Sequence, residues 1–337
     1  MFKMIKKYTM LDVAETAGVS LSTVSRVLNN SVKVSKGKRE KVLKVVKELD
    51  YNINSLASNL ASCRSKEIGV IIPDICNPFF ANVFKGIDDI ISARGYSILL
   101  YNTNYNKRNV NDYIQHIIER RVAGLILVSI ELNKNLMNSV NNKTNIVSIQ
   151  TNAEGIDCID TTNEKGSFEA TEYLIKNGHK SIAFFGWKYN ILALSERLRG
   201  YKRALLKYNI PFDEKYVIDC GFTQEEVYFA ALKFIEGGNY PTAIFAINDN
   251  TAIGIMLAFE QLGIRIPQDV SLIGFDNIST ARLVSPKLTT VAQPIYYLGE
   301  TAGEMVLNKI QKEGQGIEKN VVLPTKLIIR DSVRKIK

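Results

Sequence analysis

Short apolar segments alternate with amphipathic, helix-length segments over most of this chain. The first apolar segments are rich in Val, Ile and Leu, and they lie at residues 68–74, 96–104, 124–129 and 145–150. Helical spacing of apolar residues runs through 79–94 and 110–121, between the first three of these segments. Apolar runs of this length are typical of strands buried on both faces, and their alternation with helices indicates βαβ units with a parallel sheet.

The same alternation starts again after about residue 162. Strands are expected at 181–187, 216–222, 243–249 and 271–277, and helices at 162–177, 194–208, 225–236 and 251–262. An alternation that runs twice predicts two doubly wound domains. The late segments suit a chain that crosses back between the halves, and they lie at 289–295, 298–311 and 326–333. We expect a ligand in the cleft, at loops that follow the carboxyl ends of strands.

Two short amphipathic segments with a break between them lie within residues 9–29 (TMLDVAETAGVSLSTVSRVLN). Gly18 can adopt a positive φ at little steric cost, which suits a tight turn. Ser20 is a favourable N-cap, because its hydroxyl can accept a hydrogen bond from an N–H of the following helix. The apolar positions with helical spacing are Leu11, Ala14 and Ala17 in the first segment, and Val24, Val27 and Leu28 in the second.

An ordinary helical hairpin would fit these positions, but other features favour a DNA-binding helix-turn-helix. Ala14, Gly18 and Val24 have the spacing that lets two such helices cross closely. The second helix exposes short polar side chains and Arg26, as a helix that reads base edges does. Residues 1–66 contain 13 Lys and Arg but five Asp and Glu, so they carry +8 of the chain's net charge of +9. This charge favours a polyanionic partner.

The composition argues against several other classes of protein. The four cysteines are widely spaced and there are two histidines in all, so we expect no metal site and no cofactor. The basic start MFKMIKK lacks the apolar core of a secretory signal, and no apolar run reaches about 18 residues. We therefore expect a cytoplasmic protein without a membrane span. The absence of P-loop, GxGxxG, HExxH and GxSxG motifs argues against an enzyme.

A third helix and a polar segment follow the first two helices. Ser35 is expected to cap a helix that runs to Leu49, and the first domain should close near Tyr51. Residues 52–62 are too polar for a core and too short to fold alone, yet Leu56 and Leu60 share one helical face. We expect a hinge helix here, with a flexible linker as the alternative.

Residues 9–333 resemble the LacI/GalR (lactose/galactose/purine repressor) family of bacterial transcription regulators. The motifs that carry the resemblance are DVAETAGVSLSTVSRVLN, YNINSLASNLA, IGVIIPDICNPFF, NGHKSIAFFG, AINDNTAIG, GIRIPQDVSLIGFDN and LTTVAQP. The resemblance implies an all-α helix-turn-helix headpiece, a hinge helix and an α/β core of two doubly wound parallel-sheet subdomains of the periplasmic-binding-protein type. It also implies a homodimer that binds a pseudo-palindromic operator in double-stranded DNA.

The resemblance places the DNA contacts on the second helix and on the hinge. At the base-reading positions, Arg26 could bind a guanine bidentately and Leu21 could touch a thymine methyl. Thr23 and Ser25 fall at phosphate-contacting positions, and Leu60 falls at the position that wedges into the minor groove. The full set of implied contacts is Leu21, Ser22, Thr23, Ser25, Arg26, Asn29, Leu56 and Leu60.

The core cleft resembles that of the sugar-binding members more than that of the purine-binding members. The segment NPFF at residues 77–80 matches a loop whose rings stack on a sugar. An arginine fork and a carboxylate can each bind vicinal hydroxyls, so the chemistry agrees. The implied effector-binding residues are Asn77, Phe79, Phe80, Arg197, Phe222, Asn248, Asp276 and Gln293.

The chain departs from the family pattern at several positions. Ile53 stands where proline is usual, Ser58 where arginine is frequent, and Gly37 lies near the start of the third helix, where acidic residues are usual. Gln150 and Thr151 replace the Asp-Arg pair that sugar binders often carry. The hinge is expected despite its departures, and the identity of the sugar stays open.

These inferences predict a sequence-specific repressor of a carbohydrate-utilisation operon, relieved by a small sugar or sugar phosphate in the core cleft. A regulator that needs a co-repressor, either a nucleobase or a partner protein, is the alternative. A sugar transport receptor fits less well, because it has no use for a basic helix-turn-helix. The expected domains are residues 1–51, 52–66 and 67–337, the last divided into 67–162 plus 294–322 and 163–293 plus 323–337.

Overall fold

The computed structural model describes residues 8–28, 34–51, 65–130, 140, 144–151, 155–186, 191–236, 241–311 and 320–336. The chain forms two compact units, Met1–Arg64 and Ser65–Lys337. The predicted DNA contacts Asn29, Leu56 and Leu60 lie outside the described residues. The finer domain boundaries inferred from the sequence stay a prediction.

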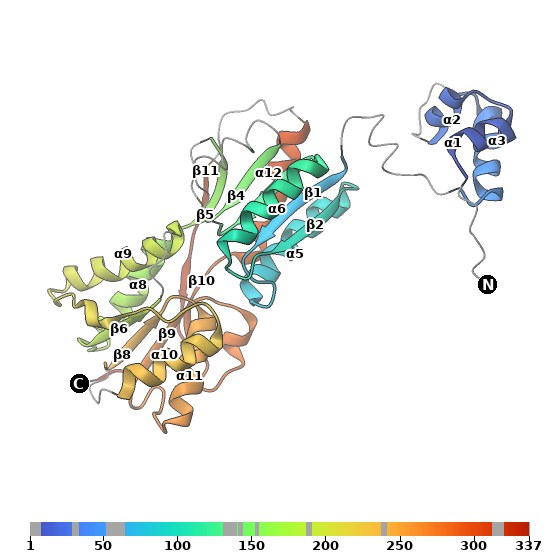
Figure 1. Ribbon diagram of the computed structural model, residues 1–337. Helices are drawn as coiled ribbons and strands as arrows, with labels where there is room; N and C mark the ends of the chain where they lie inside the picture. The colour runs from blue at the N-terminus through green and yellow to red at the C-terminus, as the bar shows by residue number, and fades with distance from the viewer. Residues whose placement is uncertain are drawn as a thin grey trace. The chain divides into compact units, whose positions relative to one another are not determined.

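The N-terminal unit, which we call the headpiece, contains the helices α1 (Met10–Ala17), α2 (Leu21–Leu28) and α3 (Lys36–Glu48) (Figure 1). The Thr9 side chain accepts a hydrogen bond from the Asp12 backbone, and the Asp12 carboxylate accepts one from the Thr9 backbone at 2.6 Å. Gly18 ends α1 with a φ of 63°. The Ser20 hydroxyl accepts from the Thr23 backbone N–H at 3.3 Å. The predicted turn and its cap are confirmed.

The headpiece core consists of small and branched side chains from all of these helices. Its buried members are Val13, Ala14, Val24, Val27, Val42, Val45 and Tyr51. The expectation that Leu11 shares the buried face with Ala14 is wrong, because Leu11 is 56% exposed and Val13 is buried instead. Ser35 occupies the predicted N-cap position of α3, but its side chain makes no capping hydrogen bond.

The second unit contains two six-stranded sheets, each with its own helices. In the first, called lobe one, the strand order is β11-β5-β4-β3-β1-β2 and the paired strands are parallel. Its strands are β1 (Glu67–Ile72), β2 (Ser97–Asn102), β3 (Gly124–Val128), β4 (Asn145–Ile149), β5 (Asp157–Thr161) and β11 (Asn320–Leu323). Its helices are α5 (Pro78–Ala93), α6 (Lys107–Arg120) and α12 (Ile295–Gln311) (Figure 1).

In the other sheet, called lobe two, the strand order is β12-β10-β9-β8-β6-β7. Its strands are β6 (Ile182–Phe185), β7 (Val217–Ile218), β8 (Ala243–Ala246), β9 (Ser271–Asp276), β10 (Thr289–Ala292) and β12 (Lys326–Ile328). Its α-helices are α8 (Asn163–Lys176), α9 (Leu192–Lys207), α10 (Gln224–Glu236) and α11 (Asp249–Gln261), and its short 3₁₀ turns are η1 (Glu214–Tyr216) and η2 (Ser279–Arg282).

The two doubly wound halves predicted from the alternation are confirmed, with local differences. Strand β12 is antiparallel to β10, so lobe two is not wholly parallel. The strand expected over residues 216–222 shrinks to β7, an edge strand with one neighbour. Strands β5 and β11 were not predicted. Strand β5 reads DCIDT and is not a continuous apolar run, and β11 reads NVVL, which is short and alternates exposed and half-buried residues.

The late helix α12 packs closely on α5 in lobe one. The chain reaches α12 from β10 of lobe two, continues into β11 of lobe one and returns to lobe two at β12. Gly86 and Gly299 allow the close approach, since a Cβ at Gly86 would lie 2.2 Å from the Tyr296 carbonyl oxygen and one at Gly299 would lie 2.0 Å from that of Val83. The chain therefore crosses repeatedly between the lobes beside the cleft. None of the helices in the described part of the chain is long and apolar enough to cross a bilayer.

Candidate functional site

Helix α2 presents its polar side chains to solvent and its branched side chains to the headpiece core. Val24 and Val27 are buried, whereas Leu21 is 47% exposed. The Ser20 hydroxyl lies within hydrogen-bond distance of those of Ser22 and Thr23, at 3.0 and 2.9 Å. The described members of the predicted DNA-contacting set are exposed or half-buried, and they are Leu21, Ser22, Thr23, Ser25 and Arg26. Their contact with DNA stays a prediction.

In the second unit, the predicted effector residues on lobe one begin directly after β1. The Asn77 side-chain oxygen accepts a hydrogen bond from the Phe79 backbone N–H at 3.0 Å and so caps α5. Pro78 occupies the first turn, where its missing N–H costs nothing. Phe79 and Phe80 follow, with their rings edge to face and their centroids 5.2 Å apart. The local sequence thus fixes both rings at the carboxyl end of a strand.

On lobe two, Arg197 of α9 is 3% exposed and is held from several sides. Its Nη1 donates to the Ile247 carbonyl at 2.7 Å, and its Nε donates to the Asn163 side-chain oxygen at 3.0 Å. The guanidinium lies 3.8 Å from the centroid of the Phe275 ring, and Nη2 lies 3.5 Å from Oδ1 of Asp276. Because every guanidinium nitrogen has a partner, the buried charge is tolerated.

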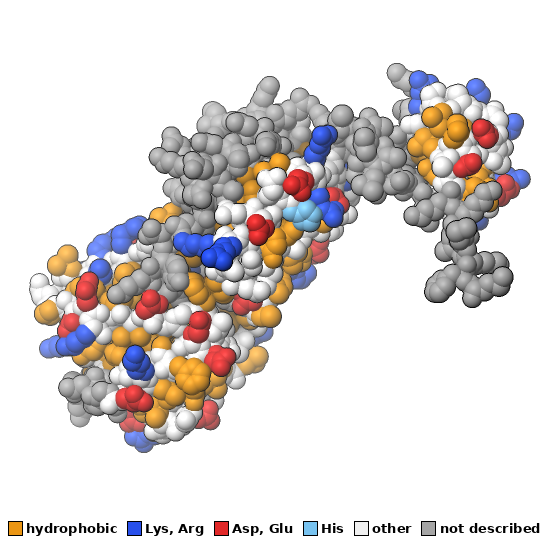
Figure 2. All heavy atoms as spheres, in the orientation of Figure 1, with side chains coloured by type: hydrophobic (Ala, Val, Ile, Leu, Met, Phe, Trp, Pro, Cys, Tyr) orange, Lys and Arg blue, Asp and Glu red, His pale blue; other side chains and the backbone are white. Residues whose placement is uncertain are grey.

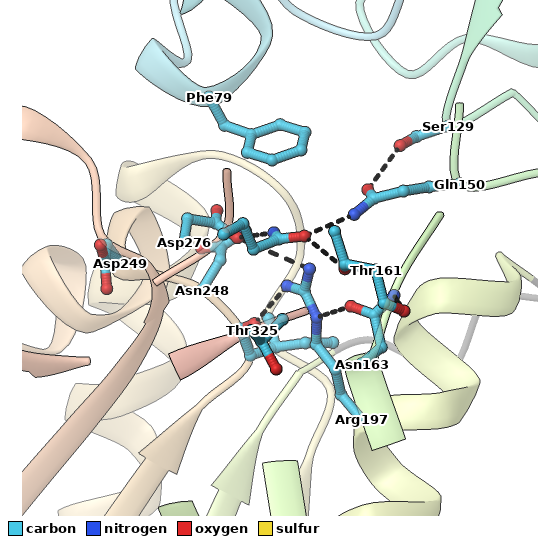
Figure 3. A network of polar contacts seen from close by, with 12 residues as sticks. Phe79, Ser129, Gln150, Thr161, Asn163, Arg197, Asn248, Asp249, Asp276 and Thr325 are labelled. Carbon is cyan, nitrogen blue, oxygen red and sulfur yellow. Dashed lines mark hydrogen bonds and ion pairs between the residues drawn. The ribbon is translucent and has the colours of Figure 1, made fainter. Parts of the chain in front are cut away.

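A chain of side-chain hydrogen bonds, here called the amide bridge, connects the lobes (Figure 3). Gln150, after β4, accepts from the Ser129 hydroxyl at 3.2 Å and donates through Nε2 to Oε1 of Gln293 at 2.8 Å. Gln293, after β10, also accepts from the Thr161 hydroxyl at 2.7 Å and donates to Oδ1 of Asp276 at 2.6 Å. The amide bridge therefore ends on Asp276, whose carboxylate pairs with the buried Arg197.

A cavity of about 40 Å³ lies at this junction. The predicted effector residues that line it are Asn77, Phe79, Phe80, Arg197, Asn248 and Asp276. Figure 3 shows the Phe79 ring on one side of this space and the polar cluster around Asp276 and Arg197 on the other. Phe222 instead lines an adjoining cavity of about 60 Å³, where its ring stacks on that of Tyr105 at 4.3 Å. Gln293 reaches the site through its hydrogen bond to Asp276.

Several residues at this site were not predicted as effector contacts. The 40 Å³ cavity is also lined by Tyr105, Ser129 and Gln150. Asn163 accepts a hydrogen bond from Arg197. The sequence did contain one signal for the first three of these residues. Each lies at or just after the end of a predicted strand: Tyr105 after β2, Ser129 after β3 and Gln150 after β4. Asn163 also follows a strand, but that strand is β5, which was not predicted, and its partner Arg197 is 34 residues away.

Carboxyl groups outnumber cations around the cleft. Burial raises the pKa of Asp276 to about 6, although the positive charge of Arg197 lowers it in part. Burial also raises the pKa of Asp160 to about 6. The pKa values of Glu196 and Asp249 are raised by burial as well. Burial lowers the pKa of Arg197, and these same four carboxyl groups oppose that shift. The cleft is thus not a region of excess positive charge.

Asp249, which lies outside the cavity lining, holds the segment that carries Asp276. Asp276 has a φ of 109°, an uncommon conformation for a residue other than glycine. The Asp249 carboxyl group accepts from the Ile278 backbone N–H at 2.9 Å and from the Thr290 hydroxyl at 2.5 Å. Its neighbour Asn248 lines the cavity and caps α11. Asp249 therefore ties two of the cavity segments together.

The described residues contain no group of three or more His, Cys, Asp or Glu side chains placed to hold a metal ion. Of the cysteines in the described part of the chain, Cys76 is exposed, and Cys158 and Cys220 are buried, all with free thiols. The chemistry of the cleft is therefore that of hydrogen bonding, ion pairing and aromatic contact.

Comparisons with known proteins agree with this architecture. Residues 9–54 match the family model of bacterial regulatory proteins of the lacI family, and residues 171–333 match that of the periplasmic binding protein-like domain. The HTH-type transcriptional repressor PurR of Vibrio vulnificus is 35% identical over 332 residues, which cover 97% of this chain and 99% of that protein.

Solved structures extend the likeness to the whole fold. A LacI family transcriptional regulator from Enterococcus faecium with bound ribose aligns with a TM-score of 0.74 at 30% identity, over 80% of this chain and 100% of that one. The lac repressor dimer bound to operator and the anti-inducer ONPF aligns with a TM-score of 0.84 at 27% identity, over 98% and 100%. These relatives are transcriptional regulators, not enzymes. The chain belongs to the LacI family and is a DNA-binding transcriptional regulator.

Proposed function

We propose that this regulator represses a carbohydrate-utilisation operon, and that a small sugar bound in the cleft releases it from its operator. The observation that carries the proposal is the buried pair of Arg197 and Asp276 at a cavity also lined by the Phe79 ring. A guanidinium and a carboxylate can each bind neighbouring hydroxyls, and a ring can cover the C–H face of a sugar. The ribose bound to the E. faecium relative supports a sugar as the ligand.

The DNA contacts proposed for the headpiece follow the exposed face of α2. Arg26 would donate two hydrogen bonds to a guanine, and Leu21 would touch a thymine methyl. Thr23 and Ser25 would position the helix through phosphates, and Asn29, Leu56 and Leu60 would complete the contacts from outside the described residues. Two headpieces in a homodimer would read the two halves of a pseudo-palindromic operator. Such a regulator would act in the cytoplasm, with the DNA.

We further propose that the homodimer uses lobe two. Apolar side chains lie over α10 and α11 in Figure 2, and Leu257 of α11 is 48% exposed. Leu257 also lines a groove of about 640 Å³, and Leu283, which adjoins the groove residue Val284, is 75% exposed. The lac repressor structure, which is a dimer, supports a dimeric assembly. A double substitution of Leu257 and Leu283 by Glu should yield monomers in sedimentation. Leu206→Glu, on α9 and as exposed as Leu283, should leave the dimer intact.

A second candidate function is a regulator that needs a co-repressor, such as a nucleobase, in order to bind its operator. The observation in its favour is the pair of rings, Phe79 and Phe80, because aromatic rings stack on planar bases as readily as on sugars. This candidate differs from the first in the sign of the ligand's effect on DNA binding.

A gel-shift titration of the full chain on the DNA upstream of its own gene tests both candidates. The first candidate predicts specific binding without ligand, and weaker binding when one sugar of a panel is added. The second predicts that a nucleobase strengthens binding. Equal binding to random DNA at physiological salt would contradict both, because a sequence-specific regulator must discriminate its operator.

A further inference from the structure

We propose that the cleft is specific for an uncharged monosaccharide and rejects the phosphorylated form of the same sugar. This inference rests on the proposed function, because it takes the cleft as the effector site. Among the described residues that line the 40 Å³ cavity, Arg197 and Asp276 are the charged ones. They pair with each other at 3.5 Å, so their charges cancel. The described lining therefore offers a phosphate group no further cation.

Arg197 is poorly placed to turn toward a phosphate. Its nitrogens already contact Ile247, Asn163 and Asp276, and the Phe275 ring covers one face of the guanidinium. Recruiting it to a phosphate would leave the Asp276 carboxylate, which is 4% exposed, without its partner. An unpaired buried charge is strongly unfavourable, and the phosphate would add further negative charge beside it.

The amide bridge favours hydroxyl groups over phosphate oxygens. The side-chain oxygens of Gln150 and Gln293 accept hydrogen bonds, while their Nε2 groups donate. A sugar hydroxyl both donates and accepts, so it can replace either partner of the bond between the two amides. An ionised phosphate only accepts hydrogen bonds. It could accept one from a glutamine Nε2 group, but beside a glutamine side-chain oxygen it would place one acceptor against another.

The size of the cavity also favours a small ligand. A single water needs roughly 10–15 Å³ of such space, so a cavity of about 40 Å³ holds about three waters. One sugar ring would have to displace the bond between Gln150 and Gln293 to gain room. A sugar phosphate would need more space still.

The adjoining cavity is the place where a phosphate would find a cation. Lys107, at the start of α6, lines that cavity, and Tyr105 and Ser129 line both cavities. Lys107 already has an interaction partner within the structure. We therefore expect it to contribute nothing to effector affinity, and the test below includes it.

The test is a ligand panel on the full wild-type chain, read by isothermal titration and by the rise in melting temperature that a ligand of the folded state causes. The panel pairs D-ribose with ribose 5-phosphate and D-glucose with glucose 6-phosphate, and includes guanine and adenine. We expect one neutral sugar to bind and its phosphate to bind about 100-fold more weakly or not at all, as the penalty for an unpaired buried charge implies.

Three substitutions sharpen the test. Gln150→Lys places a cation beside the cavity and should shift the preference toward the sugar phosphate by about tenfold or more. Gln115→Lys is the matched control, because it adds the same charge on the exposed face of α6 and should leave the preference unchanged. Lys107→Ala should also leave it unchanged.

The outcomes separate the two proposals. Tighter binding of a sugar phosphate than of its neutral sugar, or a selective loss of phosphate binding in Lys107→Ala, would overturn this inference and leave the proposed sugar-relieved repressor standing. Binding of a nucleobase in place of every sugar would overturn both. A preference for the neutral sugar that Gln150→Lys reverses supports the inference.

Discussion

The two candidate recognition surfaces of this regulator, the outer face of α2 and the cleft between the lobes, are built in opposite ways. The α2 surface comes from one continuous stretch of the chain, and its side chains are exposed or half-buried. The cleft is assembled from strand ends and helices far apart in sequence, and its central pair, Arg197 and Asp276, is almost fully buried. A substitution on α2 should therefore remove one contact, whereas a substitution in the cleft should disturb a connected network.

The cleft network also connects the two lobes, whereas the α2 surface belongs to a single helix. Gln150 of lobe one bonds to Gln293, and Tyr105 of lobe one stacks on Phe222 of lobe two. A ligand that touches both lobes can favour one arrangement of them, but only by its differential affinity for the two arrangements. The comparison thus separates a candidate DNA-binding surface from a candidate site that would regulate DNA binding.

The largest expected effect is that of Arg197→Leu. We expect effector affinity to fall at least about 100-fold and the core to lose about 3 kcal/mol of unfolding free energy, because Asp276 loses its buried partner. Calorimetry and urea unfolding measure the two quantities. Arg199→Leu is the control, since Arg199 is 52% exposed and pairs with Glu164 and Glu196 at the surface. It should change unfolding free energy by less than about 0.5 kcal/mol, and equal losses in both variants would contradict the comparison.

Arg26→Ala should act on operator binding alone. If Arg26 reads a guanine, the substitution should cost about 1–3 kcal/mol on the operator and relax the preference at one base pair. Gel shifts on operator and random DNA measure this, and effector affinity should not change. Equal weakening on both DNAs would show that Arg26 contacts a phosphate.

Asp249→Ala should weaken effector binding about tenfold, because the carboxyl group that holds the Asp276 segment is lost. Asp249→Asn should keep affinity within about threefold, since the amide can accept from the Ile278 N–H and donate to the Thr290 hydroxyl. Calorimetry with the same sugar compares the two variants. If Asn proved as harmful as Ala, the charge of Asp249 and not its hydrogen bonds would be what the cleft requires.

The smallest expected effect is a pH dependence of effector binding. The ionised Asp276 carboxylate accepts hydrogen bonds from hydroxyls, and its pKa is about 6. Affinity should therefore approach its full value about one pH unit above 6 and fall as the carboxylate takes up a proton, by about five- to tenfold between pH 7.5 and pH 5. Calorimetry at both pH values checks this. An equally steep dependence in Asp276→Asn would assign the effect to another group.

The headpiece was largely predictable because its determinants are local. The αL position of Gly18 and the cap at Ser20 act over a few residues, and both were anticipated. Leu11 was misplaced because helical spacing alone does not choose between adjacent faces; the packing against α2 and α3 selects Val13. Ser35 stands at the N-cap position without its bond, which a pattern of residue types cannot reveal.

In the core, the positions of most buried strands along the chain could be anticipated from apolar runs, but the hydrogen bonds inside the cleft could not. Gln150 was identified only as a departure from the family pattern, yet it bonds to Gln293, which lies 143 residues further along the chain. Such a contact depends on the folded positions of two strand ends. The same holds for Asp249, whose partner Thr290 lies 41 residues away.

The most direct test of the account is operator affinity with and without the sugar found in the panel, in the wild type and in Asp276→Asn. The substitution keeps the shape of the side chain and can keep a hydrogen bond to Gln293. We predict that the sugar weakens wild-type operator binding by about 5–150-fold, the usual range for coupled sites. In Asp276→Asn, sugar-free operator affinity should stay within about twofold of the wild type, and the same sugar concentration should have a much smaller effect. A full response in Asp276→Asn would contradict the account, because it would place control of the operator outside this cleft.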